Sequence, residues 1–264
     1  MDKENFKNII KSELEKPINK YSNILKSCRV DVTENIPEPE IAWELKEEEE
    51  NFNIIGTHGN FSLIKGKAKS KKSFFINMAL ASAVGEGLLQ NKLRSPLNNE
   101  NNHVLYFDTE QSKYHVQKAI KRLCEQINID VPNNLDTYSL RKLSPSERLK
   151  SIEYSIMNTP NIGFVVIDGI RDLITSINDE AESCNISSNL LKWTEELNIH
   201  ITVVLHENPG SDKARGHLGT ELTNKAETVI TIVVDKNNKD VSIVSASHSR
   251  NKEFLPFAFS IDDN

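Results

Sequence analysis

The residues best suited to chemistry lie in a polar loop between two apolar segments. FSLI at 61–64 predicts a strand, and FFINMALASA at 74–83 predicts a helix. Backbone N–H groups of such a loop and of a helix N-terminus can surround phosphate groups. Lys72 then reaches the outer phosphates of ATP, and the Ser73 hydroxyl ligates Mg²⁺. The candidate phosphate loop consists of Gly66, Lys67, Ala68, Lys69, Ser70, Lys71, Lys72 and Ser73.

The loop departs from the motif GxxxxGK[ST] at one position. Lys71 stands in place of the second glycine, where the absence of a side chain normally eases a tight backbone path. A solvated, lysine-rich loop is the alternative interpretation, with lysines at 67, 69, 71 and 72. The loop by itself leaves both interpretations open.

A carboxylate follows another apolar run. FVVI at 164–167 predicts a buried strand, and Asp168 stands at its carboxyl end, the edge where ligands bind in open α/β sheets. There it can hold Mg²⁺ beside Ser73. Capping of the following turn is the alternative role, and Asp172 is a weaker candidate in the same neighbourhood.

The segment HVLYFDTEQ resembles the corresponding strand of RecA-like ATPases, which place a catalytic glutamate just after it. The resemblance implies that Glu110 has this role. A carboxylate there can orient and deprotonate the water that attacks the γ-phosphate. The alternative is an acidic residue in a first helical turn, stabilised by the helix dipole.

Two further segments resemble RecA-like hexameric ATPases, especially plasmid replicative helicases of the RepA type and the KaiC-like branch. ITVVLHENPGSDKARGHLGTEL resembles their sensor strand and following loop, which implies that His206 senses the γ-phosphate and that 208–219 contacts DNA or a subunit through Lys213, Arg215 and His217. SASHSRNKEFLPFAFSID resembles the terminal strand pair that projects an arginine into the neighbouring subunit's nucleotide. Arg250 occupies that place, and Arg215 is its rival. A structural histidine and surface arginines are the alternatives.

The elements that must position these residues follow a βαβ rhythm. Apolar runs at 61–64, 104–107, 164–167 and 201–205 alternate with helical stretches, as in a parallel sheet covered on both faces. Only DKNNKD separates the runs at 229–234 and 241–246, which predicts a hairpin. We therefore expect an α/β, RecA-like P-loop fold with a mainly parallel sheet and an antiparallel C-terminal edge.

The first 50 residues differ from the rest. They contain the break ENIPEPE and the acidic run at 47–50, so we expect an N-terminal arm at 1–50 and an ATPase core at 51–264. Helical spacing at 7–26, interrupted by Pro17, predicts a helix in the arm. Trp43 can stack on adenine or on a neighbour, or serve as a buried anchor.

Composition narrows the function classes. The 264 residues are 38% hydrophobic and 27% charged, which is ordinary for a folded enzyme, and the net charge of −6 restricts any DNA contact to local loops. The sequence has no run of about 18 apolar residues and no secretory start, so we expect a cytoplasmic protein without membrane contact. Cys28, Cys124 and Cys184 are too scattered for a zinc site, and we expect free thiols.

The resemblance implies an ATPase that forms a homo-oligomeric ring, such as a hexamer, or a filament. It further implies helicase-like or translocase-like action on DNA during replication or transfer of a mobile element. One alternative is a nucleotide-gated switch that recruits a replication or mobilisation protein, favoured by the acidic segment INDEAES at 177–183, which would repel phosphate. Another is a degenerate module that binds ATP without turnover because of Lys71.

Overall fold

The computed structural model describes residues 20–49, 51–85, 87–207 and 216–261. The chain forms two units, Met1–Glu38 and Pro39–Asn264. In the first unit residues 20–27 are helical and exposed, and the rest of the helix expected at 7–26 lies outside the described residues. The second unit begins before the expected boundary at residue 50, because a strand at 41–46 pairs within it.

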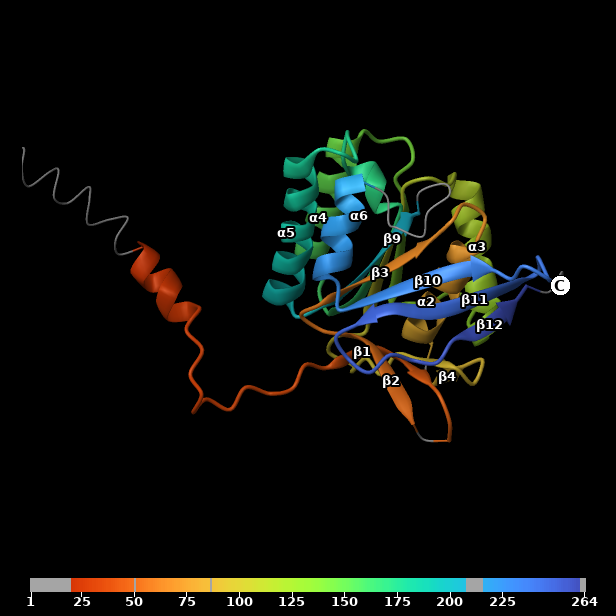
Figure 1. Cartoon of the computed structure of the whole chain (residues 1–264), viewed down its shortest axis with the longest axis horizontal. Helices are drawn as coiled ribbons and strands as arrows, with labels where there is room; N and C mark the ends of the chain where they lie inside the picture. The colour runs from red at the N-terminus through yellow and green to blue at the C-terminus, as the bar shows by residue number, and fades with distance from the viewer. Residues whose placement is uncertain (1–19, 50, 86, 208–215, 262–264) are drawn as a thin grey trace, which may run out of the picture. The chain divides into compact units, whose positions relative to one another are not determined.

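One eight-stranded sheet forms the centre of the second unit (Figure 1). The parallel strands run from β10 to β7, and β11 and β12 pair antiparallel at the other end. The expected fold class is therefore confirmed, including the hairpin between β10 and β11. In spatial order the strands are β12 (Phe257–Ser260), β11 (Val241–Ser249), β10 (Thr228–Val234), β3 (Phe61–Gly66), β9 (His200–His206), β8 (Ile162–Asp168), β6 (His103–Asp108) and β7 (Leu135–Ser139).

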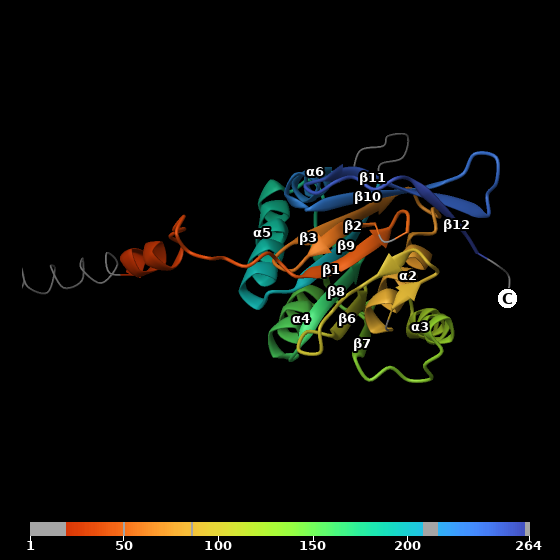
Figure 2. The ribbon, with the colours of Figure 1, turned by 90° about the horizontal axis from the view of Figure 1, so that it is seen from below.

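Helices cover both faces of this sheet, which explains why its central strands are mostly apolar (Figure 2). In β8, Phe164 and Val166 pack in one core and Val165 and Ile167 in the other, because successive side chains point to opposite faces. The first core includes α2 (Lys72–Val84) and α3 (Lys113–Ile127). The second includes η1 (Ile170–Leu173), α4 (Pro145–Asn158), α5 (Glu180–Leu197) and α6 (Gly216–Lys225).

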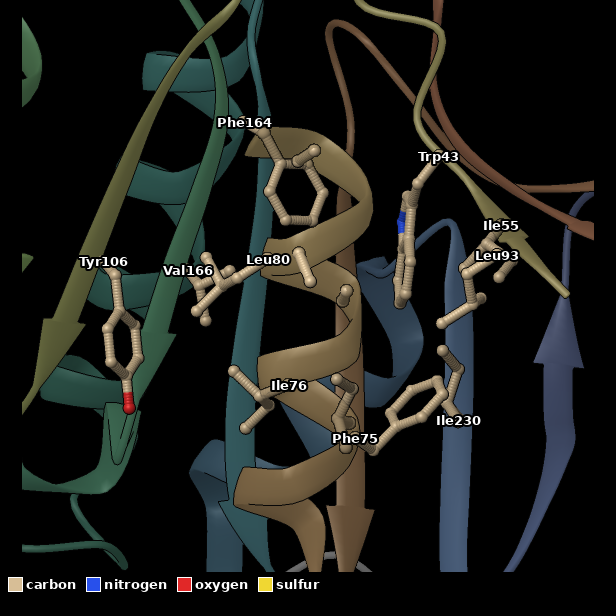
Figure 3. Close-up of a cluster of buried hydrophobic side chains, with 14 of the residues drawn as sticks. Trp43, Ile55, Phe75, Ile76, Leu80, Leu93, Tyr106, Phe164, Val166 and Ile230 are labelled. Atoms are coloured by element: carbon tan, nitrogen blue, oxygen red, sulfur yellow. The ribbon is translucent and has the colours of Figure 1, made fainter. Parts of the chain in front are cut away.

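A small antiparallel sheet, which the sequence did not predict, joins the first core. Its order is β2 (Phe52–Thr57), β1 (Ile41–Lys46), β5 (Leu93–Arg94) and β4 (Leu88–Leu89). Trp43 of β1 is fully buried beside α2, with ring centroids 6.1 Å from Phe75 and 5.8 Å from Phe164 (Figure 3). Trp43 is therefore a buried anchor, and its ring is not available to a nucleotide base.

No helix in the described part of the chain is long and apolar enough to cross a membrane. The three cysteines are free thiols.

Replacing Trp43 by alanine should lower the free energy of unfolding by about 3–5 kcal/mol, because it removes a large, fully buried side chain. Urea unfolding monitored by circular dichroism measures this loss. The control is Tyr154→Ala on α4, where a side chain that is 71% exposed should contribute less than about 0.5 kcal/mol. Equal effects of the two substitutions would contradict the anchoring role.

Candidate nucleotide site

The phosphate loop connects the end of β3 to the start of α2. Gly66 ends the strand at a point where a side chain has no room, since a Cβ atom would lie 2.4 Å from the Ile232 carbonyl oxygen and 2.7 Å from Ser70 Oγ. Helix α2 begins at Lys72, so its first backbone N–H groups face the same loop. This is the local geometry that phosphate binding at a helix N-terminus requires.

Lys72 extends its ammonium back over the loop. The side chain is buried, and Nζ donates to the carbonyl oxygens of Gly66 at 2.9 Å and Lys67 at 2.8 Å and to Ser70 Oγ at 3.4 Å. Burial lowers the pKa of Lys72, while the carboxylates of Asp168 and Glu110 oppose that shift. The structure thus holds a positive charge where the phosphate groups are expected.

The backbone of Lys71 is in the left-handed conformation, which glycine adopts more easily than other residues. This explains why the motif usually has glycine at this position. The φ of Lys71 is 64° and its ψ is 25°, in the left-handed region, where a side chain is unfavourable by about 1–2 kcal/mol. Lys69 has φ 65° in the same loop. The lysine therefore follows the tight path of the motif without opening the loop.

Ser73 and Asp168 form the oxygen-rich part of the site. Ser73 Oγ donates to Asp168 Oδ2 at 3.3 Å. Burial raises the pKa of Asp168 to about 7, with further contributions from the nearby carboxylates of Asp108 and Glu110. Hydroxyl and carboxylate oxygens are ligands that Mg²⁺ prefers, so the pair fits a magnesium ion beside the phosphate groups.

Glu110 and His206 face each other across the site. Glu110 Oε1 lies 3.4 Å from His206 Nε2, and this contact lowers the pKa of Glu110 against the opposing effect of burial. His206 ends β9 directly beside Gly66, because the two residues are paired in the parallel register of β3 and β9. The glutamate and the histidine are therefore joined next to the phosphate loop.

Asp108 is a site residue that the sequence interpretation missed. It is buried at the end of β6, and its Oδ1 accepts the backbone N–H of Glu110 at 2.9 Å and of Gln111 at 2.6 Å. Its Oδ2 accepts the Tyr106 hydroxyl at 3.1 Å. Burial raises the pKa of Asp108. The available signal was its position directly after the apolar run at 104–107, equivalent to that of Asp168.

These groups line a cavity of about 180 Å³, which is smaller than pockets that enclose a whole ligand. A second cavity of about 730 Å³ shares Phe74 with it and is also lined by Phe257 and Phe259. The smaller cavity is lined by Lys69, Ser70, Lys71, Lys72, Ser73, Phe74, Asp108, Glu110, Gln111, Asp168 and His206.

Some candidate residues lie elsewhere. Asp172 accepts the Thr109 hydroxyl at 3.0 Å and lies 4.0 Å from Arg148, so it belongs to a neighbouring network. Arg250 follows the end of β11, at the amino ends of the parallel strands and away from the phosphate loop, and its guanidinium donates to the Lys225 carbonyl oxygen at 2.9 Å. Arg215, like Lys213, lies outside the described residues.

The fold and the arrangement of these side chains are those of a RecA-like P-loop ATPase. The crystal structure of the RadB recombinase is similar, with a TM-score of 0.51 and 16% sequence identity over 78% of this chain and 88% of that chain, a likeness of fold alone. No curated protein matches the sequence. A family model described as an AAA domain matches residues 40–212, and the chain belongs to this family.

Substituting Asp168 by asparagine should stabilise the nucleotide-free protein in a pH-dependent way. The pKa of Asp168 is about 7 in the folded chain against 3.8 for the ordinary side chain, so the folded state holds the proton more tightly. The wild-type carboxyl therefore destabilises the fold most above pH 7 and ceases to do so below about pH 4.

We expect Asp168→Asn to raise the free energy of unfolding by about 2–4 kcal/mol at pH 8 and by little at pH 4. Urea unfolding at both pH values measures the difference between variant and wild type. Asp130→Asn, at an exposed position, is the matched control and should change the free energy of unfolding by less than about 0.5 kcal/mol. If the difference in free energy of unfolding between Asp168→Asn and wild type were the same at pH 4 and pH 8, the raised pKa would be contradicted.

Proposed function

We propose that this chain binds Mg·ATP at the phosphate loop and hydrolyses it. The observation that carries the proposal is the Glu110–His206 contact, which stands beside the buried ammonium of Lys72 and the Ser73–Asp168 pair. A site that only held phosphates would not need a carboxylate joined to an imidazole at this place.

Each group has a separate role in the proposed reaction. Lys72 binds the outer phosphates, for which it must release part of its hydrogen bonding to the loop. Glu110 orients the attacking water and accepts its proton, and Asp108 positions Glu110 by accepting its backbone N–H. His206 senses the γ-phosphate and transmits its presence to Glu110. Magnesium, held by Ser73 and Asp168, would neutralise developing charge on the phosphates.

The nucleotide base has a candidate position in the larger cavity. This cavity meets the phosphate site at Phe74 and is lined by the aromatic residues Phe257 and Phe259, against which a planar ring could pack. The smaller cavity then holds the phosphate groups alone, in keeping with its volume of about 180 Å³.

We further propose that hydrolysis drives helicase-like or translocase-like movement on DNA in replication or transfer of a mobile element. Support comes from the resemblance to RepA-type helicases in the segments around His206 and Arg250. The segment expected to contact DNA, 208–219, follows β9 in the sequence, and His217, one of the residues of this segment that the structure describes, is exposed. We infer a homo-oligomer, because Arg250 lies away from the phosphate loop of its own chain and would reach a nucleotide only in another subunit. We also propose that the protein is cytoplasmic.

The nucleotide-gated switch is the second candidate function. The acidic segment 177–183 lies against the start of α6, since Leu218 N–H donates to the Ile177 carbonyl oxygen at 3.4 Å. Asp179 and Glu180 are exposed there and would repel a phosphate backbone. This arrangement favours a protein partner, such as a replication or mobilisation protein, over DNA.

Two substitutions separate nucleotide binding from turnover. Lys72→Ala should weaken ATP binding by about tenfold or more, because a charged hydrogen bond to phosphate is lost. Glu110→Gln should retain affinity but lower turnover by about 100-fold, because an amide cannot accept the proton. Calorimetric titration with ATP and phosphate release with and without single-stranded DNA measure both effects, and Glu153→Gln on the exposed face of α4 is the control.

The same assays distinguish the candidate functions. Turnover stimulated by DNA supports movement on DNA, whereas turnover that DNA leaves unchanged supports the switch. ATP binding by the wild-type protein without any turnover would leave only the degenerate binding module.

The role of Arg250 is tested by mixing inactive subunits. Arg250→Ala and Glu110→Ala should each lower turnover, and an equimolar mixture should recover part of it. Recovery is expected because some interfaces then pair an intact Glu110 site with an intact Arg250 from the neighbour. Failure of the mixture to exceed the separate variants, under conditions where they co-assemble by light scattering, would remove the support for an arginine supplied in trans.

A further inference from the structure

The side chain of Lys71 has an unusual environment. Its Nζ is shielded from solvent and has no hydrogen-bond partner among the described residues. The residue also lines the phosphate cavity, together with Lys72 and Ser73. An ammonium withdrawn from water and left without an acceptor is unfavourable.

The ammonium of the adjacent Lys72, in contrast, is fully hydrogen-bonded. Lys72 uses its three donor positions on Gly66, Lys67 and Ser70. Lys71 therefore has unused hydrogen-bonding capacity, whereas Lys72 must give up contacts within the loop before it can bind a phosphate. The acidic groups of the cavity, Asp108, Glu110 and Asp168, would also repel a polyphosphate unless additional positive charge is present.

The backbone conformation of Lys71 is also unfavourable for a residue that carries a side chain. With φ at 64°, a glycine would adopt this conformation more easily, and glycine would also remove the unpartnered ammonium. Both unfavourable features belong to one residue in the wall of one cavity. A ligand that accepts hydrogen bonds from the ammonium would satisfy this group, and that gain could offset the unfavourable backbone conformation.

We propose that Lys71 is a phosphate-binding residue whose ammonium contacts the nucleotide phosphates directly, so that a lysine in place of the motif glycine adds a binding group. The inference rests on the proposed function, since it requires nucleotide at this site. On this proposal, the lysine that replaces the motif glycine increases the affinity for phosphate and does not impair the loop.

Three substitutions separate the charge of Lys71 from its backbone conformation. Lys71→Ala removes the charge and keeps the strain, Lys71→Gly removes both, and Lys71→Arg keeps both. Calorimetric titration of each full-length variant with ATP and Mg²⁺ should show affinity reduced about tenfold or more in the alanine and glycine variants. The arginine variant should stay within about threefold of wild type. Lys118→Ala, which removes an exposed lysine of α3, is the control and should bind as wild type does.

The glycine variant is decisive, because it restores the motif and relieves the strain, so it should fold. Unchanged or tighter ATP binding by Lys71→Gly would overturn the inference. Titration with AMP gives a second readout, since loss of a contact to the outer phosphates should weaken ATP far more than AMP. Equal losses for the two nucleotides would overturn a direct phosphate contact.

The outcome is distinguishable from failure of the proposed function. If wild-type protein and all variants fail to bind ATP, the proposed function itself is wrong. If wild type binds ATP and Lys72→Ala abolishes binding while Lys71→Ala leaves it unchanged, only the inference about Lys71 fails.

Discussion

The parallel register of the central strands is the constraint on which the site depends. Gly66 pairs with His206, and Asp108 pairs with Asp168, so residues far apart in the sequence end at the same edge of the sheet. Each is the last residue of its strand. Because the strands are hydrogen-bonded neighbours, a slip in one pairing would move a catalytic candidate away from the phosphate loop. The chemistry proposed here is thus a consequence of strand pairing.

This convergence has an electrostatic consequence. Asp108, Glu110 and Asp168 stand near one another in a partly buried place, and their mutual repulsion adds to burial in raising the pKa of Asp168 to about 7. The contact with His206 and the nearby ammonium of Lys72 lower the pKa of Glu110. Groups held in unfavourable ionisation states are common where a ligand or metal completes the charge balance. The proposed contact of the Lys71 ammonium with the phosphates would add positive charge to this acidic site.

The helix that follows the phosphate loop is largely buried. Helix α2 buries residues on all sides, because it lies in the core between the central sheet and the strand that carries Trp43. Phe75 contacts both Trp43 and Phe259, at centroid distances of 6.1 Å and 6.3 Å. Packing of this kind fixes the start of the helix, so the backbone N–H groups of the phosphate loop keep their direction without help from a ligand.

The sequence by itself determined the local features. The order of apolar runs predicted the α/β fold and its antiparallel edge, and the polar residues near those runs identified Lys72, Ser73 and Asp168 as candidates. The resemblance to RecA-like ATPases added Glu110 and His206. These features are readable because hydrophobic periodicity and strand-end position act over a few residues. The structure brings these five side chains to one cavity.

Only the tertiary structure decided the features that depend on distant pairing. It showed that Asp108 supports Glu110, that Trp43 is buried by an additional small sheet, and that Arg250 lies away from the phosphate loop of its own chain. It also showed that Lys71 follows a left-handed path with an unpartnered ammonium. The reason is physical: which strands pair, and which side chains lose water, is settled by contacts between residues tens to hundreds of positions apart.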